Sequence, residues 1–533
     1  MRATKMKTAI SKTQLLLVAM VGVVLLLAAT AHAAAPGITG PIFSLTAKDA
    51  YITQPDGQMV YSWGYGCAAA PSGYAPSTIS GFCNSMQIPG PTLIVTAPAS
   101  GTATVTVSLT NGLPAAAGNT SILFPGFSVT TSGGVAGLLT QEAPPAGSVS
   151  YTLTIPSTAA GTHAYYSGTQ GDLQVEMGLY GAIIVLPSGT PTACTSGVHS
   201  SNQSAQGHWG ESDFRLAAAA YNHPQACYDR EYLFQFSEMD PNIHEQAMLQ
   251  VTARAGCVVA DPTCHLDVPT EPYHPAYFMI NGRSMPDDMD ANYSQTYPHQ
   301  PYNGNPHMHP GEQVLLRIIG QGRWQHPFHE HGNHVRILGR DGNLIPSATD
   351  PNSLAGPLLF TTTTTPGMAM DGIFYWTAKG LNWDAYGHKP NSSDPNAVLP
   401  CTPDANGYNT SAPMAINYYE WCQDHNKPLQ VAPFGDVAGG GPATLPDPNL
   451  FTNGAWYGGS PYLGPDATVR AAGPTGSTPP SGTIANPPTT EAGFAFMWHS
   501  HNEREITTNN AFPGGMLMMM LVDSREFVID ESN

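Results

Sequence analysis

Short segments in which apolar and polar residues alternate, separated by turn residues, restrict the fold of this chain more than any other feature. TATVTVSLTNGLP (102–114) alternates and ends in an Asn-Gly turn, and SVSYTLTIP (148–156) alternates and ends at a proline. GLYGAIIVLP (178–187) is apolar almost throughout, as a buried strand is. Successive side chains on a strand point to opposite faces, so alternation predicts strands with one buried face. No segment between residues 40 and 188 has a helical period, which predicts a β-sandwich of the Greek-key type.

A second set of strand-like segments occupies the C-terminal half of the chain. It opens with EYLFQFSEMD (231–240), includes EQVLLRIIG (312–320) and closes with GMLMMMLVD (515–523). A chain of 533 residues is too long for one ordinary core, so at least two domains are expected. We therefore predict an all-β protein made of two β-sandwich domains with long loop insertions.

The predicted domain boundaries follow changes in composition. Residues 1–35 combine a cationic start, an apolar run and Ala31-His32-Ala33, which together predict a cleaved secretory signal peptide. We assign domain 1 to 36–190, an irregular linker to 191–225 and domain 2 to 226–533. Domain 2 contains an insertion at about 385–490. It includes AGGGPATLPDP (438–448) and AAGPTGSTPPSGTIANPP (471–488), where the density of Gly and Pro argues against a packed strand.

Charge and cysteine content exclude some partners and favour export. Only 11% of residues are charged and the net charge is −19, which argues against a nucleic-acid or anionic-membrane partner. No segment after the signal peptide is apolar enough to span a bilayer. The eight cysteines predict four disulfides between sequence neighbours, namely Cys67–Cys83, Cys194–Cys227, Cys257–Cys264 and Cys401–Cys422. A secreted, periplasmic or cell-surface location is expected.

Two histidine-rich segments, HPFHEHGNH (326–334) and WHSHNERE (498–505), are candidate metal sites. On a strand, His329 and His331 share one face, and His499 and His501 do the same. Two such pairs on neighbouring strands would bring four imidazoles together. Imidazole suits copper, zinc, iron or nickel, so the ligand type alone leaves the metal open.

These segments resemble known copper motifs. HPFHEHG (326–332) resembles the third copper motif of the multicopper oxidases, H-P-x-H-x-H-G, and WHSH (498–501) resembles the fourth, where the family has His-Cys-His. PGPTLIV (89–95) resembles the opening strand of the first cupredoxin domain, and GLYGAIIV (178–185) resembles its last strand. The resemblance extends over most of the mature chain and is similar to the two-domain oxidases. It implies two cupredoxin sandwiches, a trinuclear copper cluster at the domain interface and a blue copper site that passes electrons from a substrate to oxygen.

The first two copper motifs of the family are missing from domain 1. Leu123 and Pro125 stand where the first motif has its histidines, and Tyr166 and Gly168 stand at the ligand positions of the second. His163 is close to the second motif but three residues out of register. By this resemblance, domain 1 lacks all four of its expected ligands.

In domain 2 the cluster motifs are intact but the blue-copper residues are not. The resemblance assigns His329 to the type 2 copper and three other histidines to the type 3 pair. Ser500 replaces the cysteine of the blue site, Glu505 replaces its second histidine, and Met516 is the nearest candidate for its axial methionine. A serine hydroxyl is a hard, weakly acidic ligand and does not replace a thiolate. The predicted metal ligands are therefore His326, His329, His331, His499 and His501.

Three functions are compatible with these residues. The preferred one is an exported copper-binding protein that retains half of the histidine cluster, with another transition metal as an alternative ion. The second is a copper-dependent oxidoreductase that uses a non-standard site with His326, Glu505 or Tyr166, although oxygen reduction in the family manner is not expected. The third is a cell-surface structural protein on a cupredoxin scaffold. The resemblance further implies a homotrimer. His307 and His309 could form a second metal site, but this is the weaker alternative. We expect these two histidines to lie on the surface.

Overall fold

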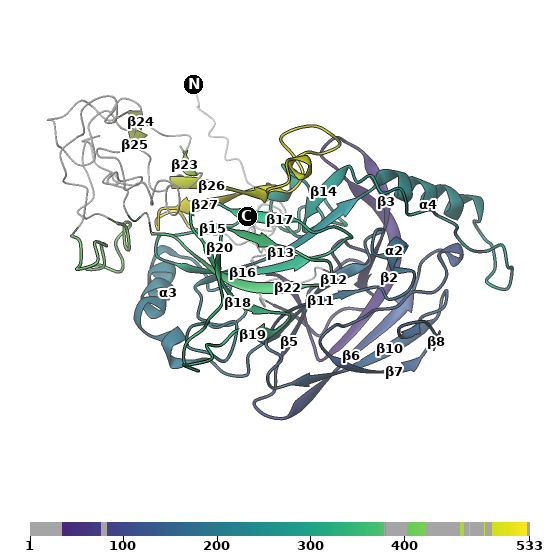
Figure 1. Ribbon diagram of the computed structural model, residues 1–533, viewed down its shortest axis with the longest axis horizontal. Helices are drawn as coiled ribbons and strands as arrows, with labels where there is room; N and C mark the ends of the chain where they lie inside the picture. The colour runs from purple at the N-terminus through teal and green to yellow at the C-terminus, as the bar shows by residue number, and fades with distance from the viewer. Residues whose placement is uncertain are drawn as a thin grey trace, which may run out of the picture.

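Two β-sandwiches, each made of two sheets, form the body of the protein (Figure 1). The computed structural model describes residues 35–75, 83–377, 379, 402–421, 459–462, 468–469, 484–485 and 493–529. Residues 1–34 of the predicted signal peptide and the Cys401–Cys422 pair lie outside these residues. The all-β prediction of two sandwich domains is confirmed.

Two five-stranded sheets form the first sandwich. One sheet has the order β11 (Gly161–Tyr166), β12 (Tyr180–Leu186), β5 (Leu93–Thr96), β1 (Gly37–Thr39) and β4 (Gly73–Ala75). The other has the order β3 (Met59–Cys67), β2 (Ile42–Thr53), β6 (Thr102–Asn111), β10 (Ser148–Pro156) and β7 (Ser128–Gly133). A short hairpin of β8 (Val135–Ala136) and β9 (Gln141–Glu142) and the helix α2 (Gly171–Gln174) complete the domain. Neighbouring strands are often distant in sequence, as Greek-key connections require.

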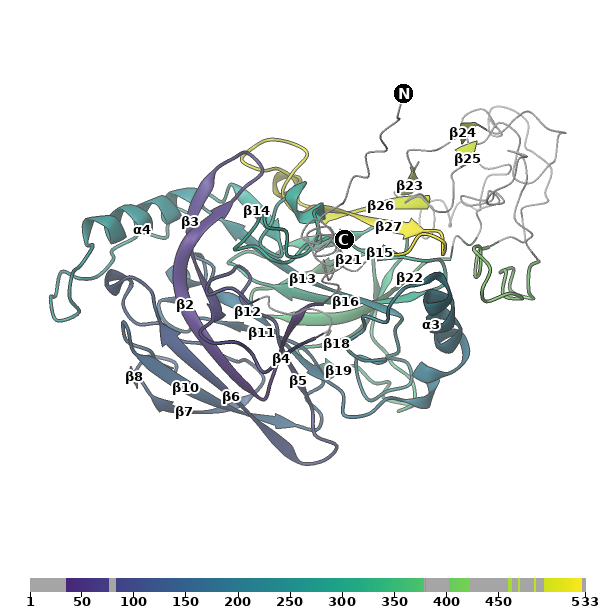
Figure 2. The ribbon, with the colours of Figure 1, turned by 180° about the vertical axis from the view of Figure 1, so that it is seen from behind.

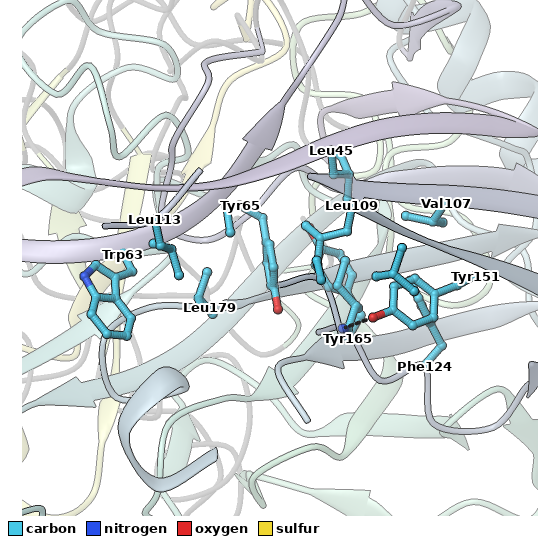
Figure 3. Packing of buried hydrophobic residues seen from close by; sticks show 14 of the residues in the cluster. Leu45, Trp63, Tyr65, Val107, Leu109, Leu113, Phe124, Tyr151, Tyr165 and Leu179 are labelled. Carbon is cyan, nitrogen blue, oxygen red and sulfur yellow. Dashed lines mark hydrogen bonds between the residues drawn. The ribbon is translucent and has the colours of Figure 1, made fainter. Parts of the chain in front are cut away.

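The alternation in β6 has the predicted effect on packing. Val105, Val107 and Leu109 are buried between the two sheets, while Thr106 and Ser108 between them face outward. Figure 3 shows Val107 and Leu109 among the aromatic rings of this core. The Tyr151 hydroxyl there accepts a hydrogen bond from the Ile122 amide (3.1 Å) and donates one to the Gln141 carbonyl (2.9 Å), so its polar atom is satisfied inside the apolar core.

Two larger sheets form the second sandwich. The first has the order β14 (Tyr277–Ile280), β13 (Arg230–Met239), β16 (Gln313–Gly320), β22 (Ala369–Tyr375), β18 (Val335–Arg340) and β19 (Asn343–Leu344), with β20 (Leu358–Leu359) also paired to β18. The second has the order β15 (His307–Met308), β27 (Leu517–Asp523), β26 (Gly493–Ser500), β17 (Pro327–Glu330) and β21 (Thr361–Thr363). Between them lies an apolar core that includes Phe328, Trp498 and Met518, so the methionine run near the C-terminus packs inward.

Parts of the predicted linker and insertion are more regular than expected. The helix α3 (Gly197–Trp209) lies within 191–225, which was predicted to be irregular, and it runs along one side of the second sandwich (Figures 1 and 2). A second helix, α4 (Pro241–Ala253), follows β13. In the insertion, β23 (Gly459–Tyr462) pairs with β26, and β24 (Thr468–Val469) pairs with β25 (Ile484–Ala485). The short strand β25 lies within 471–488, one of the two segments whose Gly and Pro density argued against a packed strand.

Three of the four predicted disulfides are present in the described residues: Cys67–Cys83, Cys194–Cys227 and Cys257–Cys264. They join residues that are close in sequence, as predicted. Within the described part of the chain, no helix is both long enough and apolar enough to cross a bilayer.

The two sandwiches are joined by a buried polar contact around Asp371 of β22. Its carboxylate accepts hydrogen bonds from the amide (3.0 Å) and hydroxyl (2.6 Å) of Thr162 in β11, and from the Tyr221 hydroxyl (2.6 Å). Arg317 of β16 lies 3.6 Å from the same carboxylate and balances its charge. The contact therefore ties both domains and the 191–225 segment together.

Removing one hydroxyl from this contact should weaken it measurably. Tyr221→Phe should lower the free energy of unfolding by about 1.5–3 kcal/mol, because a hydrogen bond to a buried carboxylate is lost. Urea denaturation measures the change. Tyr51→Phe is the matched control, because Tyr51 is exposed and its hydroxyl donates to the Met248 sulfur rather than to a buried carboxylate. If Tyr221→Phe and Tyr51→Phe lowered the free energy of unfolding equally, a stabilising role of the Tyr221–Asp371 hydrogen bond would be contradicted.

Candidate metal centre

The two predicted histidine segments pair as neighbouring antiparallel strands. His329 of β17 is directly opposite His499 of β26, and Phe328 is opposite Ser500. We call His329, His331, His499 and His501 the histidine cluster. Their ring centroids are 4.8 Å apart for His329–His331 and His329–His501, 5.2 Å for His331–His499 and 5.5 Å for His329–His499. The predicted gathering of four imidazoles on one face is confirmed.

Hydrogen bonds orient two of these rings. Nδ1 of His329 lies 2.7 Å from the Thr361 hydroxyl, and Nδ1 of His499 lies 2.7 Å from the Ser500 carbonyl oxygen. A carbonyl only accepts, so His499 carries its proton on Nδ1 and its Nε2 keeps a lone pair. Nε2 of His499 lies 3.3 Å from Nε2 of His331. A ring that donates through one nitrogen and presents the other is the usual arrangement of a metal-binding histidine.

The histidine cluster lies at the edge of the domain. His329 is only 1% exposed and His499 is 9% exposed, whereas the side chain of His501 is 53% exposed. Burial, together with the three neighbouring imidazoles, lowers the pKa of His329 to about 4. His329 is therefore neutral at pH 7, the form that binds a metal ion. Its buried position beside the exposed His501 gives the cluster an inner and an outer imidazole.

His326 makes different contacts from the other four predicted ligands. Its Nδ1 lies 2.9 Å from a Glu505 carboxylate oxygen and its Nε2 lies 2.9 Å from a Glu238 carboxylate oxygen. Ser500 donates a 2.5 Å hydrogen bond to the same oxygen of Glu505. We call Glu238, His326, Ser500 and Glu505 the buried ion cluster, since each is at most 2% exposed. His326, Ser500 and Glu505 stand at the positions that the resemblance assigns to the blue-copper site. In the structure, hydrogen bonds to Glu505 link the three residues.

The protonation of His326 follows from these contacts. Desolvation lowers its pKa, but hydrogen bonds and charge from Glu238 and Glu505 outweigh this effect and raise the pKa to about 9. At pH 7 the ring is an imidazolium that donates through both nitrogens. An imidazolium has no lone pair for a metal ion. Met516, the candidate axial ligand, is buried in the apolar core of the domain. The residues present do not fit a blue copper ion.

In domain 1 the expected ligand positions are packed against each other. The backbones of Leu123 and Tyr166 form an isolated bridge, with a 2.7 Å hydrogen bond from the Leu123 amide to the Tyr166 carbonyl. A Cβ atom at Gly168 would lie only 2.7 Å from Cγ of Leu123, so the leucine side chain covers that position. These three residues line a cavity of about 340 Å³ together with Gln321 and Pro366. None of the five offers an imidazole, thiolate or carboxylate to a metal ion.

A second group of residues with metal-binding side chains forms ion pairs with an arginine. Among the described residues, Glu211, His309 and Glu312 form the group of three whose ligand atoms lie within 4.8 Å of one another. Arg230 forms ion pairs with both carboxylates, including a 2.6 Å contact to Glu312. Burial raises the pKa of Glu211, but Arg230 and His309 outweigh this effect and hold the pKa below its usual value. An arginine between the two carboxylates supplies the positive charge that a metal ion would bring.

This group also corrects the prediction for His307 and His309. Both are buried rather than on the surface, at 2% and 1% exposure. Nδ1 of His307 lies 2.7 Å from the Asp523 carboxylate, and Nε2 of His309 lies 2.7 Å from Glu211. They connect β15 to the end of β27 and to the segment after α3.

Sequence reasoning missed Glu238 and Thr361, which orient the predicted histidines. Glu238 lies on β13, a strand whose ten residues are all buried. A buried carboxylate requires a partner, so an acid inside the apolar run EYLFQFSEMD was an available signal. Thr361 carried no signal, because it is the first of a row of threonines on β21.

The fold and site define a protein of two β-sandwich domains with a candidate metal centre on paired strands of the second. Two family models, both described as multicopper oxidase, match residues 70–190 and 269–370. The chain belongs to the multicopper oxidase family. No curated protein sequence matches the chain.

Several solved structures are similar at low sequence identity. The multicopper oxidase mgLAC is 13% identical with a TM-score of 0.43, covering 90% of this chain and 86% of its own. A blue copper oxidase from Nitrosomonas europaea is 14% identical with a TM-score of 0.41, covering 90% of this chain and 85% of its own. A copper nitrite reductase from the same organism is 15% identical with a TM-score of 0.35, covering 63% of this chain and 85% of its own. All three TM-scores are below 0.5, so the family assignment rests on the two family models.

Proposed function

We propose that this protein is an exported copper-binding protein that holds one copper ion on its histidine cluster. The observation that carries the proposal is the 3.3 Å separation between Nε2 of His331 and Nε2 of His499. Two imidazole nitrogens bound to one ion at about 2.0–2.1 Å, with a tetrahedral angle between them, are also about 3.3 Å apart. The pair therefore has the spacing of two ligands on a common ion.

His329 and His501 are the expected third and fourth ligands. Their rings neighbour each other at 4.8 Å, on the same face as the first pair. Ligand atoms of three cluster members do not yet lie within 4.8 Å of one another, so ion binding requires side-chain rotation. The exposed side chain of His501 has room to rotate. An imidazole-only site binds Cu(II) more tightly than Zn(II) by the general order of affinities, so copper is the expected ion.

A single ion is proposed because the remaining copper positions are filled by other contacts. Leu123 packs over Gly168 in domain 1, and His326 is held as an imidazolium in domain 2. Copper bound at the histidine cluster would supply a redox-active or Lewis-acid centre with water in any open position. The chain's own residues bind and orient that ion. Oxygen reduction in the family manner is not part of the proposal.

Export is proposed from two features. Residues 1–35 have the composition of a secretory signal peptide. The disulfides at Cys67–Cys83, Cys194–Cys227 and Cys257–Cys264 are stable in an oxidising compartment and rare in the cytosol. Both features support a secreted, periplasmic or cell-surface location.

Copper titration of the purified full-length chain tests the proposal. Isothermal titration calorimetry with Cu(II) should give about one equivalent bound per chain, and metal analysis after dialysis should give the same value. Binding of less than about a tenth of an equivalent would contradict the proposal. Zn(II) titrated in parallel should bind more weakly.

Thr361→Val should weaken copper binding about 10-fold. The substitution conserves shape but removes the hydroxyl that lies 2.7 Å from Nδ1 of His329, and loss of such an orienting group typically costs 10- to 100-fold in metal affinity. Thr363→Val, two residues away on the same strand but exposed, is the matched control. Equal copper affinity in the two variants would remove Thr361 from the site.

A further inference from the structure

A cavity of about 670 Å³ lies on the sheet that carries β18 and β22, on the face away from the domain core. Arg336 on β18 lines it, whereas its neighbours Val335 and Ile337 point into the core on the other side of the sheet. Leu338 and Ile373 also line the cavity, and both are buried. The volume is within the usual range of small-molecule sites, about 300–1,000 Å³.

The polar groups of this cavity are mainly donors. Arg336 uses one guanidinium nitrogen to donate a 2.8 Å hydrogen bond to the Gly356 carbonyl, and no ion pair is recorded for it within the described part of the chain. The side-chain amides of Gln313 and Gln225 and the ring of His334 also line the cavity. Gln225 accepts a 2.7 Å hydrogen bond from the Leu354 amide through its oxygen, which leaves its NH₂ group directed to other acceptors.

The charge of the cavity is opposite to that of the chain as a whole. The protein has 38 acidic and 19 basic residues, yet none of the described residues lining the cavity is Asp or Glu. Arg336 therefore faces the cavity with no nearby carboxylate lining it. A guanidinium binds a carboxylate through two parallel N–H donors, which is a strong and directional contact.

We propose that this cavity binds a small organic carboxylate with an apolar body. The carboxylate contacts Arg336, with the amide NH₂ groups of Gln313 and Gln225 as additional donors. The apolar body contacts Leu338 and Ile373. The site needs no metal ion, so the proposal is independent of the copper-binding proposal.

The cavity is also next to the histidine cluster. The ring of His334 lies 5.2 Å from the ring of Phe360, and Phe360 lies 5.6 Å from the ring of His329. One aromatic ring, Phe360, therefore separates His334 of the cavity lining from His329 of the cluster. This position follows from the turn between β17 and β18, which carries both His331 and His334.

Calorimetric titration of the metal-free full-length chain with 1-naphthoate tests the proposal, with the neutral amide 1-naphthamide as the comparison ligand. Naphthoate should bind at least about tenfold more tightly than naphthamide, because a charge-assisted contact is present only with the acid. Arg336→Gln should reduce naphthoate affinity by at least about tenfold and leave naphthamide affinity unchanged. Raising the salt concentration should weaken naphthoate binding only.

Two further variants keep the test decisive. Arg340→Gln is the matched control, because Arg340 is an exposed arginine on the same strand that does not line the cavity. It should bind naphthoate like the wild-type chain. Gln313→Glu, which adds a carboxylate with almost no change in shape, should weaken naphthoate binding as Arg336→Gln does. Equal affinity for naphthoate and naphthamide, equal effects of the two arginine variants, or no naphthoate binding at millimolar concentration would each overturn the proposal.

Discussion

His326→Ala should lower the free energy of unfolding by about 3–5 kcal/mol, because it leaves two buried carboxylates without their shared cation. Glu238 and Glu505 are at most 2% exposed and lie on either side of the ring, each 2.9 Å from one of its nitrogens. Ser500 and the amides of Arg323 and Trp324 continue to donate to these carboxylates, but hydrogen bonds alone do not neutralise two charges. Urea denaturation at pH 7 measures the loss.

The same imidazolium predicts a loss of stability at alkaline pH. The folded-state pKa of His326 is raised to about 9, above the 6.5 of an unfolded histidine. The contribution of His326 to the free energy of unfolding is therefore fully present below pH 6.5 and is lost as the pH rises from 6.5 through about 9. The shift corresponds to about 3 kcal/mol. His326→Gln, which cannot carry a proton, should remove this part of the pH dependence.

His244 provides the matched control for both measurements. It is also fully buried, but its nitrogens contact backbone carbonyl oxygens of Tyr61 and Glu176, and burial lowers its pKa to about 4. His244→Gln should change the pH dependence only between about pH 4 and 6.5, where the neutral ring stabilises the folded state. An alkaline profile that is the same in the wild-type chain and in His326→Gln would show that His326 is not an imidazolium.

The second large effect is expected at the histidine cluster. His499→Ala should reduce copper affinity by more than about 100-fold, because it removes one of the two nitrogens that have the spacing of a ligand pair, and losing a second-shell partner already costs 10- to 100-fold. His499 lies at the edge of the core with 9% exposure, so the fold should survive the substitution. Competition titration against a chelator of known copper affinity measures the change.

Two controls separate this loss from a general effect of removing histidines. His265→Ala removes an exposed histidine far from the cluster in sequence and should leave copper affinity unchanged. His326→Gln should also leave the copper stoichiometry unchanged, although it destabilises the fold. A copper affinity that falls equally in His265→Ala and His499→Ala would contradict the assignment of His499.

The sandwiches were predictable because alternation and turn residues report directly on strand geometry. β6 and β10 are almost identical to the segments predicted from their alternating residues. The helix α4 was missed although Asp240 caps it by accepting from the Asn242 amide (2.9 Å) and Pro241 follows at its first position, a known helix-start signal. This signal directly follows the apolar, strand-like run EYLFQFSEMD (231–240) and shares Asp240 with it.

The site was predictable only where spacing alone determines which side chains meet. His-x-His on a strand places both rings on one face, so the pairing of β17 with β26 was enough to form the histidine cluster. The partners of His326 could not be predicted, because Glu238 is 88 positions away in sequence and only the sheet order brings it close. Ser500 and Glu505 looked like losses in sequence, whereas in the structure Glu505 contacts His326 and Ser500 donates a hydrogen bond to Glu505.

Electron paramagnetic resonance of the copper-loaded full-length chain, with the spins counted against total bound copper, tests the central claim most directly. We expect about one bound copper per chain, all of it detected as an isolated Cu(II) ion with nitrogen ligands and without thiolate character. This signal should be lost in His499→Ala. Detection of a thiolate-bound copper, or of several coppers of which part is silent through coupling in a pair, would contradict it.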